Sequence, residues 1–385
     1  MADQVADALR LRAWAVQVLS AGWKTPPDVP LEAWKLFLRA ERCAVALSTR
    51  TEGDAPPLLH AAATVELQRI LSARAQIEEL GRQVAAIGER VVVLKGGLMA
   101  LGSSAGIDLV DIDILTEPRS ASRIAGLLDS RGYLTHGPGS PVHLAQRRQE
   151  FAVPIEVHHA LTELPASDLW ARAEPVPGRP GRLGLWRPAP IDQAWHALVH
   201  SVVTHPFRRG SLRDLLLIGW AEPSLDDAGR RALEGQVRAH PRGNMLAAML
   251  RLAREIRDSR APGDPFLQEA AAHYQLTRNS GPLGQSVLKS SIMLSAYAML
   301  DGGRARLGYW HSVWNGRDHR SPWPLLARVE TAWPPAGRWL RRVLRLLRLP
   351  LAELNAFWIV RRAKRLAGAH GGMEAKTLVM RSGEP

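Results

Sequence analysis

The chain has 385 residues and a formal net charge of +13, with 46% hydrophobic and 23% charged residues. This composition excludes a mainly disordered chain, and the length is enough for two or three domains. The single cysteine, Cys43, excludes an internal disulfide framework and favours a reducing, cytoplasmic location. The first ten residues lack the basic and apolar regions of a secretory signal, and no apolar stretch of about 18 residues predicts a membrane span.

The first region of the chain, residues 1–88, is expected to be helical. Its apolar residues recur at spacings of three and four, which is the period of an amphipathic helix. Breaks rich in proline and glycine divide the region. The predicted helices cover residues 5–19, 31–47 and 58–87.

The pattern changes in residues 89–188, where short β-branched and alternating segments predict strands. Lys95-Gly96-Gly97 predicts a tight turn after the first strand, and residues 118–133 predict an amphipathic helix closed by Gly132. Residues 175–190 predict a loop or a short hairpin. The predicted strands cover residues 90–94, 109–115 and 151–158.

Helical patterns return in residues 189–280, and residues 281–385 form a basic region rich in tryptophan. Residues 336–385 hold eleven Lys and Arg against three Asp and Glu. Much of the positive charge therefore lies in the C-terminal region and not around the predicted strands. The predicted helices of the third region cover residues 189–204, 211–221, 224–240, 243–258 and 264–276, and another is expected over residues 286–300.

Two aspartates on the second predicted strand indicate a metal site. Asp111 and Asp113 are two residues apart, so on a strand both carboxylates project from one face, about 6–7 Å apart along the backbone. Two such carboxylates repel each other, and a divalent cation removes that cost. Glu156 lies between apolar residues of the third predicted strand and is expected to share the cation. A D-x-D pair alone is more often a solvent-exposed strand face; the order of all the motifs favours the metal site.

Such a carboxylate triad suits chemistry at phosphorus. Two Mg²⁺ or Mn²⁺ ions held there would bind a nucleotide's phosphates, lower the pKa of an acceptor hydroxyl and stabilise a leaving pyrophosphate. Lys95, Gly96 and Gly97 are expected to bind phosphate through a positive charge and an accessible backbone. His158 shares a strand face with Glu156 and could contact a phosphate, although a structural histidine is the preferred interpretation.

These motifs, in this order, resemble the uncharacterised nucleotidyltransferase family of the DNA polymerase beta-like superfamily. The resemblance runs over about residues 60 to 230 and includes a helical part after the third strand. The segments that carry it are Val-Leu-Lys95-Gly-Gly97, Val-Asp111-Ile-Asp113-Ile-Leu-Thr116, Gly132-Tyr133, Ile-Glu156-Val-His158-His159, Trp195-His196-Ala-Leu-Val-His200 and Leu212-Arg213-Asp214-Leu215.

The resemblance implies an α+β fold, in which a small mixed β-sheet core carries Asp111, Asp113 and Glu156 and has helical N-terminal and C-terminal regions. It also implies an enzyme that uses Mg²⁺ or Mn²⁺ to move a nucleoside monophosphate from an NTP to an unknown hydroxyl or phosphate acceptor. A peptide natural product or another small molecule is a possible acceptor. The expected regions are 1–88 (helical), 89–188 (nucleotidyltransferase core), 189–280 (helical) and 281–385 (basic and Trp-rich).

Departures from the family pattern motivate an alternative with a weakened nucleotide grip or no activity, among them the replacement of the G-S phosphate motif of related families by Lys95-Gly96-Gly97. Family members usually carry an arginine shortly before the first aspartate, and residues 106–109 hold none. The glutamate strand reads Ile-Glu-Val-His-His in place of the family's I-E-L-H-W. The alternative is therefore a catalytically weak module with the same fold that binds a nucleotide or a partner.

A second alternative rests on histidines in the third region. His196 and His200 are four residues apart on a predicted helix and share a face. With His205 and Asp214 they could ligate a transition metal, as in a metal-dependent phosphohydrolase. The preferred interpretation is that these residues line the contact between helices and sheet.

The C-terminal region contains two basic amphipathic patterns separated by Pro350. These predicted helices could bind a membrane surface, a nucleic acid or an acidic partner protein. The preferred interpretation is docking on the rest of the protein with the arginines in solvent.

Overall fold

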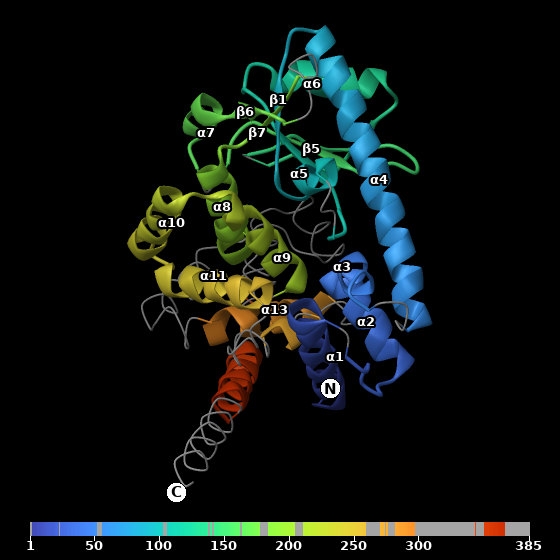
Figure 1. Cartoon of the computed structure of the whole chain (residues 1–385), viewed down its shortest axis with the longest axis vertical. Helices are drawn as coiled ribbons and strands as arrows, with labels where there is room; N and C mark the ends of the chain where they lie inside the picture. Colours follow the sequence, from blue (N-terminus) through green and yellow to red (C-terminus); the bar gives the residue numbers. More distant parts are fainter. Residues whose placement is uncertain are drawn as a thin grey trace, which may run out of the picture.

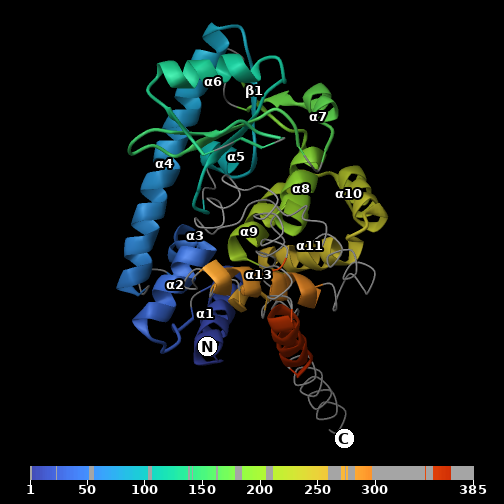
Figure 2. The same ribbon diagram turned by 180° about the vertical axis from the view of Figure 1, so that it is seen from behind.

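The structure is a computed structural model. It describes residues 2–22, 24–51, 56–102, 106–137, 139–140, 142–161, 164–177, 184–204, 211–258, 270–273, 275, 282–296, 343 and 350–365. A sheet layer lies at one end and a helical assembly at the other, and the long helix α4 runs beside both (Figures 1 and 2).

The N-terminal region is helical, as predicted, but it has one more helix than expected. Its helices are α1 (Ala2–Ala21), α2 (Leu31–Glu41), α3 (Ala44–Ser48) and α4 (Pro57–Ala86). The helix predicted over residues 31–47 is divided because Arg42 adopts the left-handed conformation with φ 49°. Such a residue ends a helix, since right-handed hydrogen bonding cannot continue through it.

Seven strands form one mixed sheet in the described residues, in the order β3-β4-β5-β2-β1-β7-β6. The central strand β2 pairs with β5 in parallel and with β1 in antiparallel orientation. The structure confirms the predicted α+β fold with a mixed sheet. The strands are β1 (Val91–Val93), β2 (Ile112–Leu115), β3 (Leu134–His136), β4 (Gln146–Arg148), β5 (Ile155–His158), β6 (Glu174–Pro175) and β7 (Leu185–Arg187).

Two strands are shorter than predicted for one shared reason. The β2–β5 pairing begins with Ile112 opposite Ile155, and Asp111 lies just before it. The residue before Ile155 is Pro154, whose carbonyl accepts a hydrogen bond from the Ile112 N–H at 2.7 Å. Proline has no N–H to donate in return, so the ladder stops there.

The sheet has two chemically different faces. One face is apolar and packs against α4, α5 (Lys95–Leu101) and α6 (Ala121–Ser130). The buried side chains that β2 and β5 give to it are Ile112, Ile114, Ile155 and Val157. Because side chains alternate along a strand, the residues between them, Asp113 and Glu156, belong to the opposite face. Near that face lie the helix α7 (Ala166–Arg172) and a second apolar cluster with Leu115.

The helices after β7 share a core with the N-terminal helices α1, α2 and α3. They are α8 (Pro190–Val199), the π-helix η1 (His200–Thr204), α9 (Leu212–Ala221), the 3₁₀ turn η3 (Glu222–Ser224), α10 (Asp227–Ala239), α11 (Gly243–Arg257) and α13 (Pro282–Ala296). These positions agree closely with the predicted helices, although most of the helix predicted over residues 264–276 lies outside the described residues. The division into four regions remains a prediction.

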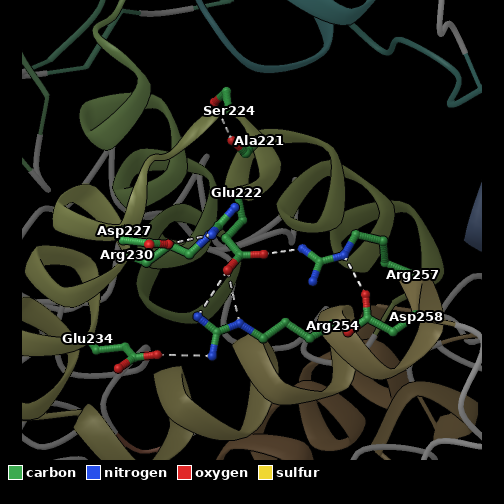
Figure 3. Close-up of polar contacts among 9 residues, drawn as sticks. All are labelled: Ala221, Glu222, Ser224, Asp227, Arg230, Glu234, Arg254, Arg257 and Asp258. Atoms are coloured by element: carbon green, nitrogen blue, oxygen red, sulfur yellow. Dashed lines mark hydrogen bonds and ion pairs between the residues drawn. The ribbon is translucent and has the colours of Figure 1, made fainter.

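A buried glutamate ties the end of α9 to α11 (Figure 3). The Glu222 side chain is 3% exposed and accepts a hydrogen bond from Arg254 Nε at 3.0 Å. Arg257 pairs with the other oxygen of the same carboxylate, and Arg254 also reaches Glu234 at 3.1 Å. Two positively charged side chains on one buried carboxylate fix the two helices relative to each other, and α9 is one of the helices that line the cavity on the side opposite the sheet.

The described part of the chain contains no helix that is both long enough and apolar enough to cross a bilayer. Residues 350–365 form a further helix beyond α13. It covers residues 351–365 of the second basic pattern, for which the sequence predicts a helix over residues 351–368. Of the first basic pattern, only Val343 lies within the described residues.

Candidate active site

Asp113 and Glu156 face each other across the parallel pair β2–β5, because the register places them directly opposite. His158 follows on the same face of β5, and its Nε2 lies 2.9 Å from Asp113 Oδ1 and 3.7 Å from Glu156 Oε2. Donor atoms of these three residues lie within 4.8 Å of one another. The register therefore brings together two side chains predicted as metal ligands and the histidine predicted beside them.

Asp111 lies just before β2 and lines the same cavity as Asp113 and Glu156. Burial and, after it, the charges of Asp113 and Glu156 raise the pKa of Asp111 from 3.8 to about 6, against the opposing effect of Lys95. A carboxyl with this pKa is costly to ionise among other carboxylates. A cation beside it would remove that cost, which is the electrostatic condition expected of a metal site.

Lys95 makes an ion pair with the central aspartate. Its Nζ lies 3.1 Å from Asp113 Oδ2, and the two side chains are 11% and 9% exposed. Lys95 has a backbone φ of +48°, an unusual value for a residue with a side chain. Burial favours the neutral form of Asp113, but Lys95 and His158 outweigh it and hold the Asp113 pKa well below its ordinary value.

Gly96 and Gly97 lie buried in the first turn of α5, beneath Lys95. A Cβ on Gly97 would lie 2.8 Å from a methyl of Val93, and one on Gly96 would lie 3.4 Å from Leu109. Close packing of α5 on the sheet thus explains Gly97, while the 3.4 Å contact at Gly96 is an ordinary van der Waals distance. Their role in phosphate binding remains a prediction.

The cavity that contains the carboxylates has a volume of about 350 Å³ and a second wall made by helices. His196 from α8, His200 from η1 and Arg213 from α9 line this wall. The His196 and His200 rings lie 5.6 Å apart. These histidines therefore line the contact between helices and sheet, while His205, the third histidine of the phosphohydrolase alternative, lies outside the described residues.

Three further residues at the site were missed by sequence reasoning. Gln146 of β4 donates a hydrogen bond from Nε2 to Glu156 Oε1 at 3.1 Å. The His143 ring lies 5.2 Å from the His158 ring and lines the cavity. Arg213 faces the carboxylates, and its charge favours the ionised form of Asp111. No local pattern in the sequence marks Gln146 or His143. Arg213 lies in the segment Leu212-Arg213-Asp214-Leu215, which supported the family resemblance but did not indicate a role for the arginine.

The comparison with protein families decides the identity. The family model described as "Uncharacterised nucleotidyltransferase" matches residues 43–258, more than half of the chain. The chain belongs to this nucleotidyltransferase family. The match begins in the N-terminal region and ends in α11, so it includes both walls of the cavity. No curated protein and no solved structure matches the chain.

The side chains of this nucleotidyltransferase site fit a hard divalent cation. Carboxylate oxygens are the ligands that Mg²⁺ and Mn²⁺ prefer, and Asp111, Asp113 and Glu156 supply them from one side of the cavity. His158 Nδ1 is buried without a hydrogen-bond partner among the described residues, and Nε2 faces Asp113. The histidine therefore suits a role in orienting the aspartate.

Proposed function

We propose that the chain is a Mg²⁺- or Mn²⁺-dependent enzyme that transfers a nucleoside monophosphate from an NTP to an acceptor hydroxyl or phosphate. The observation that carries this proposal is the juxtaposition of Asp113 and Glu156 on parallel strands, with Asp111 in the same cavity. Three acidic groups in one partly buried cavity are costly without a cation. Membership of the nucleotidyltransferase family supports the reaction class.

In this proposal Asp111, Asp113 and Glu156 hold the cation. A bound ion would neutralise phosphate charge, lower the pKa of the acceptor hydroxyl and stabilise the leaving pyrophosphate. The protein's own contribution is then to fix the carboxylates. Gln146 holds Glu156 at 3.1 Å and His158 holds Asp113 at 2.9 Å, so neither carboxylate is free to rotate away.

Two positively charged side chains on opposite sides of the cavity are proposed to bind the triphosphate. Lys95 lies beside Asp113 on the sheet side, and Arg213 lies on the helical side. The family's usual arginine before the first aspartate is absent here, and Arg213 supplies a positive charge from a different element. Phosphoryl-type transfer depends mainly on positioning and charge neutralisation. Gly96, Gly97 and His158 remain proposed as further nucleotide-binding residues.

Binding a triphosphate would also change the pairing of Lys95. The Lys95–Asp113 ion pair uses Asp113 Oδ2, an oxygen that a cation would need. A phosphate group near Lys95 offers its ammonium group a second anion, which leaves Asp113 available to the metal. Nucleotide and cation are therefore proposed to bind cooperatively.

The acceptor is proposed to be small, because the cavity holds about 350 Å³ and the nucleotide takes part of it. A peptide natural product with one reactive hydroxyl near its end meets this condition, as does another small molecule. The proposed location is the cytoplasm, where NTPs are abundant and Cys43, which is buried, stays reduced.

The direct test is pyrophosphate release from NTPs in the presence of Mg²⁺. Wild-type protein and Asp113→Asn are compared, with Asp227→Asn as a control for an exposed aspartate on α10. The proposal expects turnover in wild type and in the control, and a loss of at least about 100-fold in Asp113→Asn. Equal turnover in all three proteins would remove the assignment. Mass spectrometry of candidate acceptors incubated with mixed NTPs identifies the product.

The alternative of a catalytically weak binding module makes a different prediction. It is favoured by one observation, namely that both Asp113 oxygens are already engaged, by Lys95 and by His158. An NTP would then raise the melting temperature, while no NTP and acceptor combination would give pyrophosphate. Turnover that depends on Asp113 would exclude this alternative.

A further inference from the structure

The helix of residues 350–365 presents an exposed apolar surface. Leu351, Leu354, Phe357 and Trp358 are 55%, 59%, 57% and 52% exposed. These four side chains lie within eight consecutive residues, a concentration of exposed large apolar side chains that is unusual on a protein surface. The Phe357 and Trp358 rings contact each other edge to face, with centroids 6.0 Å apart.

The opposite side of the same helix packs on the protein. Ala352 and Ala356 are buried with Leu294 of α13, and Ile359 and Ala363 join the main helical core. These four residues repeat at spacings of three and four and so form one face. The helix is therefore already anchored through a face of three alanines and Ile359, and its two leucines and two aromatic residues are exposed away from that face.

Positive charge continues the exposed surface toward the C-terminal end of the helix. Arg361, Lys364 and Arg365 are exposed there, and the Arg361 guanidinium lies 5.5 Å from the centroid of the Trp358 ring. Glu353 is the one acidic residue between positions 350 and 365. The surface thus combines two leucines, two aromatic rings and a cationic end. Figures 1 and 2 place this helix, in red, at the end of the molecule away from the sheet.

We propose that Leu351, Leu354, Phe357 and Trp358, with Arg361, Lys364 and Arg365, form a docking surface for an anionic lipid bilayer. Aromatic rings between apolar and charged groups match the chemical gradient at the boundary of acyl chains and headgroups. The cations match anionic headgroups, and each basic residue near such a surface contributes about fivefold to partitioning.

Two other occupants fit this surface less well. An acidic protein surface would pair with the three basic side chains. It would leave the four apolar side chains, which cover a similar area, without an apolar partner. A second copy of the chain would place its three basic side chains near the same three basic side chains of the first copy, and this like-charge repulsion is unfavourable. Only a lipid surface offers negative charge and apolar contact together without a matched protein surface.

This docking surface is independent of the proposed catalytic site. The helix lies beyond the segment matched by the nucleotidyltransferase family, which ends at residue 258. The lipid contact therefore stands whether or not the enzyme assignment holds.

The test is co-sedimentation of the full-length protein with vesicles of phosphatidylcholine that contain about one-third phosphatidylserine. An apolar variant carries Phe357→Ser and Trp358→Ser, and a charge variant carries Arg361→Ser, Lys364→Ser and Arg365→Ser. The matched controls are Leu134→Ser, an exposed leucine on β3, and the triple change Arg82→Ser, Arg119→Ser and Arg231→Ser on other elements. Thermal melting verifies that every variant is folded.

We expect wild-type protein and both controls to sediment with the anionic vesicles. The charge variant should bind about 100-fold more weakly, and the apolar variant at least about tenfold more weakly. Lipids brominated near the headgroup should quench wild-type tryptophan fluorescence more than that of Trp358→Ser.

Four results would overturn the proposal. The first three are wild-type protein left in the supernatant with anionic vesicles at low salt, variants that sediment as well as the controls, and binding to soluble polyglutamate but not to vesicles. The third result would assign the surface to an acidic protein partner. A concentration-dependent dimer that needs Phe357 and Trp358, without vesicle binding, would likewise overturn it and assign the surface to a second copy.

Discussion

Lys95 Nζ lies 3.1 Å from Asp113 Oδ2 in a cavity where both side chains are nearly buried. The lysine thus occupies an oxygen of the central carboxylate, at the place where a cation is proposed to bind. This ion pair explains how the protein tolerates Asp111, Asp113 and Glu156 in one cavity, since one positive charge offsets part of the repulsion. It also makes Lys95 the residue most directly coupled to the proposed metal ligands.

The first prediction concerns Lys95→Met, which keeps the apolar stem and removes the charge. Asp113 loses its ion pair, so its pKa should rise from its present low value. If Lys95 also holds the triphosphate, kcat/KM for the NTP should fall by at least about 100-fold. Lys24→Met, an exposed lysine outside the cavity, is the control. Wild-type kinetics in Lys95→Met would contradict the proposed role.

Arg213→Met should weaken nucleotide binding with a smaller effect on the chemical step. Arg213 faces the carboxylates from α9 but makes no ion pair with them in the described part of the chain, so its proposed role is to bind phosphate in the ground state as well as in the transition state. We expect KM for the NTP to rise about tenfold while kcat changes less. Steady-state kinetics measure both, with exposed Arg231→Met on α10 as the control. An unchanged KM would contradict this assignment.

Glu66 provides a prediction about pH and stability, away from the site. Burial raises its pKa from 4.5 to about 7, against a backbone hydrogen bond from Val45 that lowers it. Between these pH values the folded protein therefore keeps a proton on Glu66 that the unfolded chain loses, so the contribution of Glu66 to stability is greatest below pH 4.5 and falls as the pH rises to about 7. Above about pH 7 the ionisation of Glu66 has lowered the free energy of unfolding by about 3 kcal/mol at most.

Glu66→Gln should remove this pH dependence. A glutamine oxygen can still accept the hydrogen bond from the Val45 N–H, which is 3.0 Å from Glu66 Oε2. We expect the variant to be more stable than wild type at pH 8, by about 1–3 kcal/mol, and close to it at pH 5. Urea unfolding at both pH values measures the difference. A stability loss at pH 8 would show that the ionised carboxylate is needed.

Arg12→Met should strongly destabilise the helical core. Arg12 and Glu41 are both fully buried, with Arg12 Nη1 2.9 Å from Glu41 Oε1. Removal of the arginine leaves a buried negative charge, which costs about 3–5 kcal/mol. Glu41 also accepts a hydrogen bond from the Leu212 N–H at 2.6 Å, at the start of α9. The ion pair thus couples the N-terminal helices to the helix that carries Arg213.

The matched comparison is the double variant Arg12→Met with Glu41→Gln. The glutamine keeps an acceptor for Leu212 and carries no charge, so the double variant should be more stable than Arg12→Met alone. Urea unfolding of the two single variants and the double variant gives the interaction energy. Equal stability of Arg12→Met and the double variant would show that the buried charge is not the cause.

Much of the fold was predictable because it depends on local patterns. The helical period predicted the ends of α4, α9 and α11 to within one residue. The alternation of apolar and acidic residues in β2 placed Asp113 on the face opposite Ile112 and Ile114. The ends of β2 and β5 were less predictable. They depend on Pro154 lying opposite the start of β2, which is a relationship between two strands and not within either.

The site was predictable only in part for the same reason. Asp113 and Glu156 were identified from their strands, but their direct opposition depends on the β2–β5 register. The approach of Arg213 depends on how α9 packs against the sheet, and the hydrogen bond from Gln146 depends on β4 pairing with β5. Tertiary relationships of this kind leave no periodic signal in the sequence.

The most direct test of the central claim, that three carboxylates hold one cation site, is Mn²⁺ binding followed by electron paramagnetic resonance. Titrations with and without a non-hydrolysable NTP analogue would compare wild type, Asp111→Asn, Asp113→Asn, Glu156→Gln and the control Asp227→Asn. The account predicts Mn²⁺ binding that the nucleotide strengthens in wild type and the control, and that each site variant weakens by at least about tenfold. Equal Mn²⁺ affinity in all five proteins would contradict it.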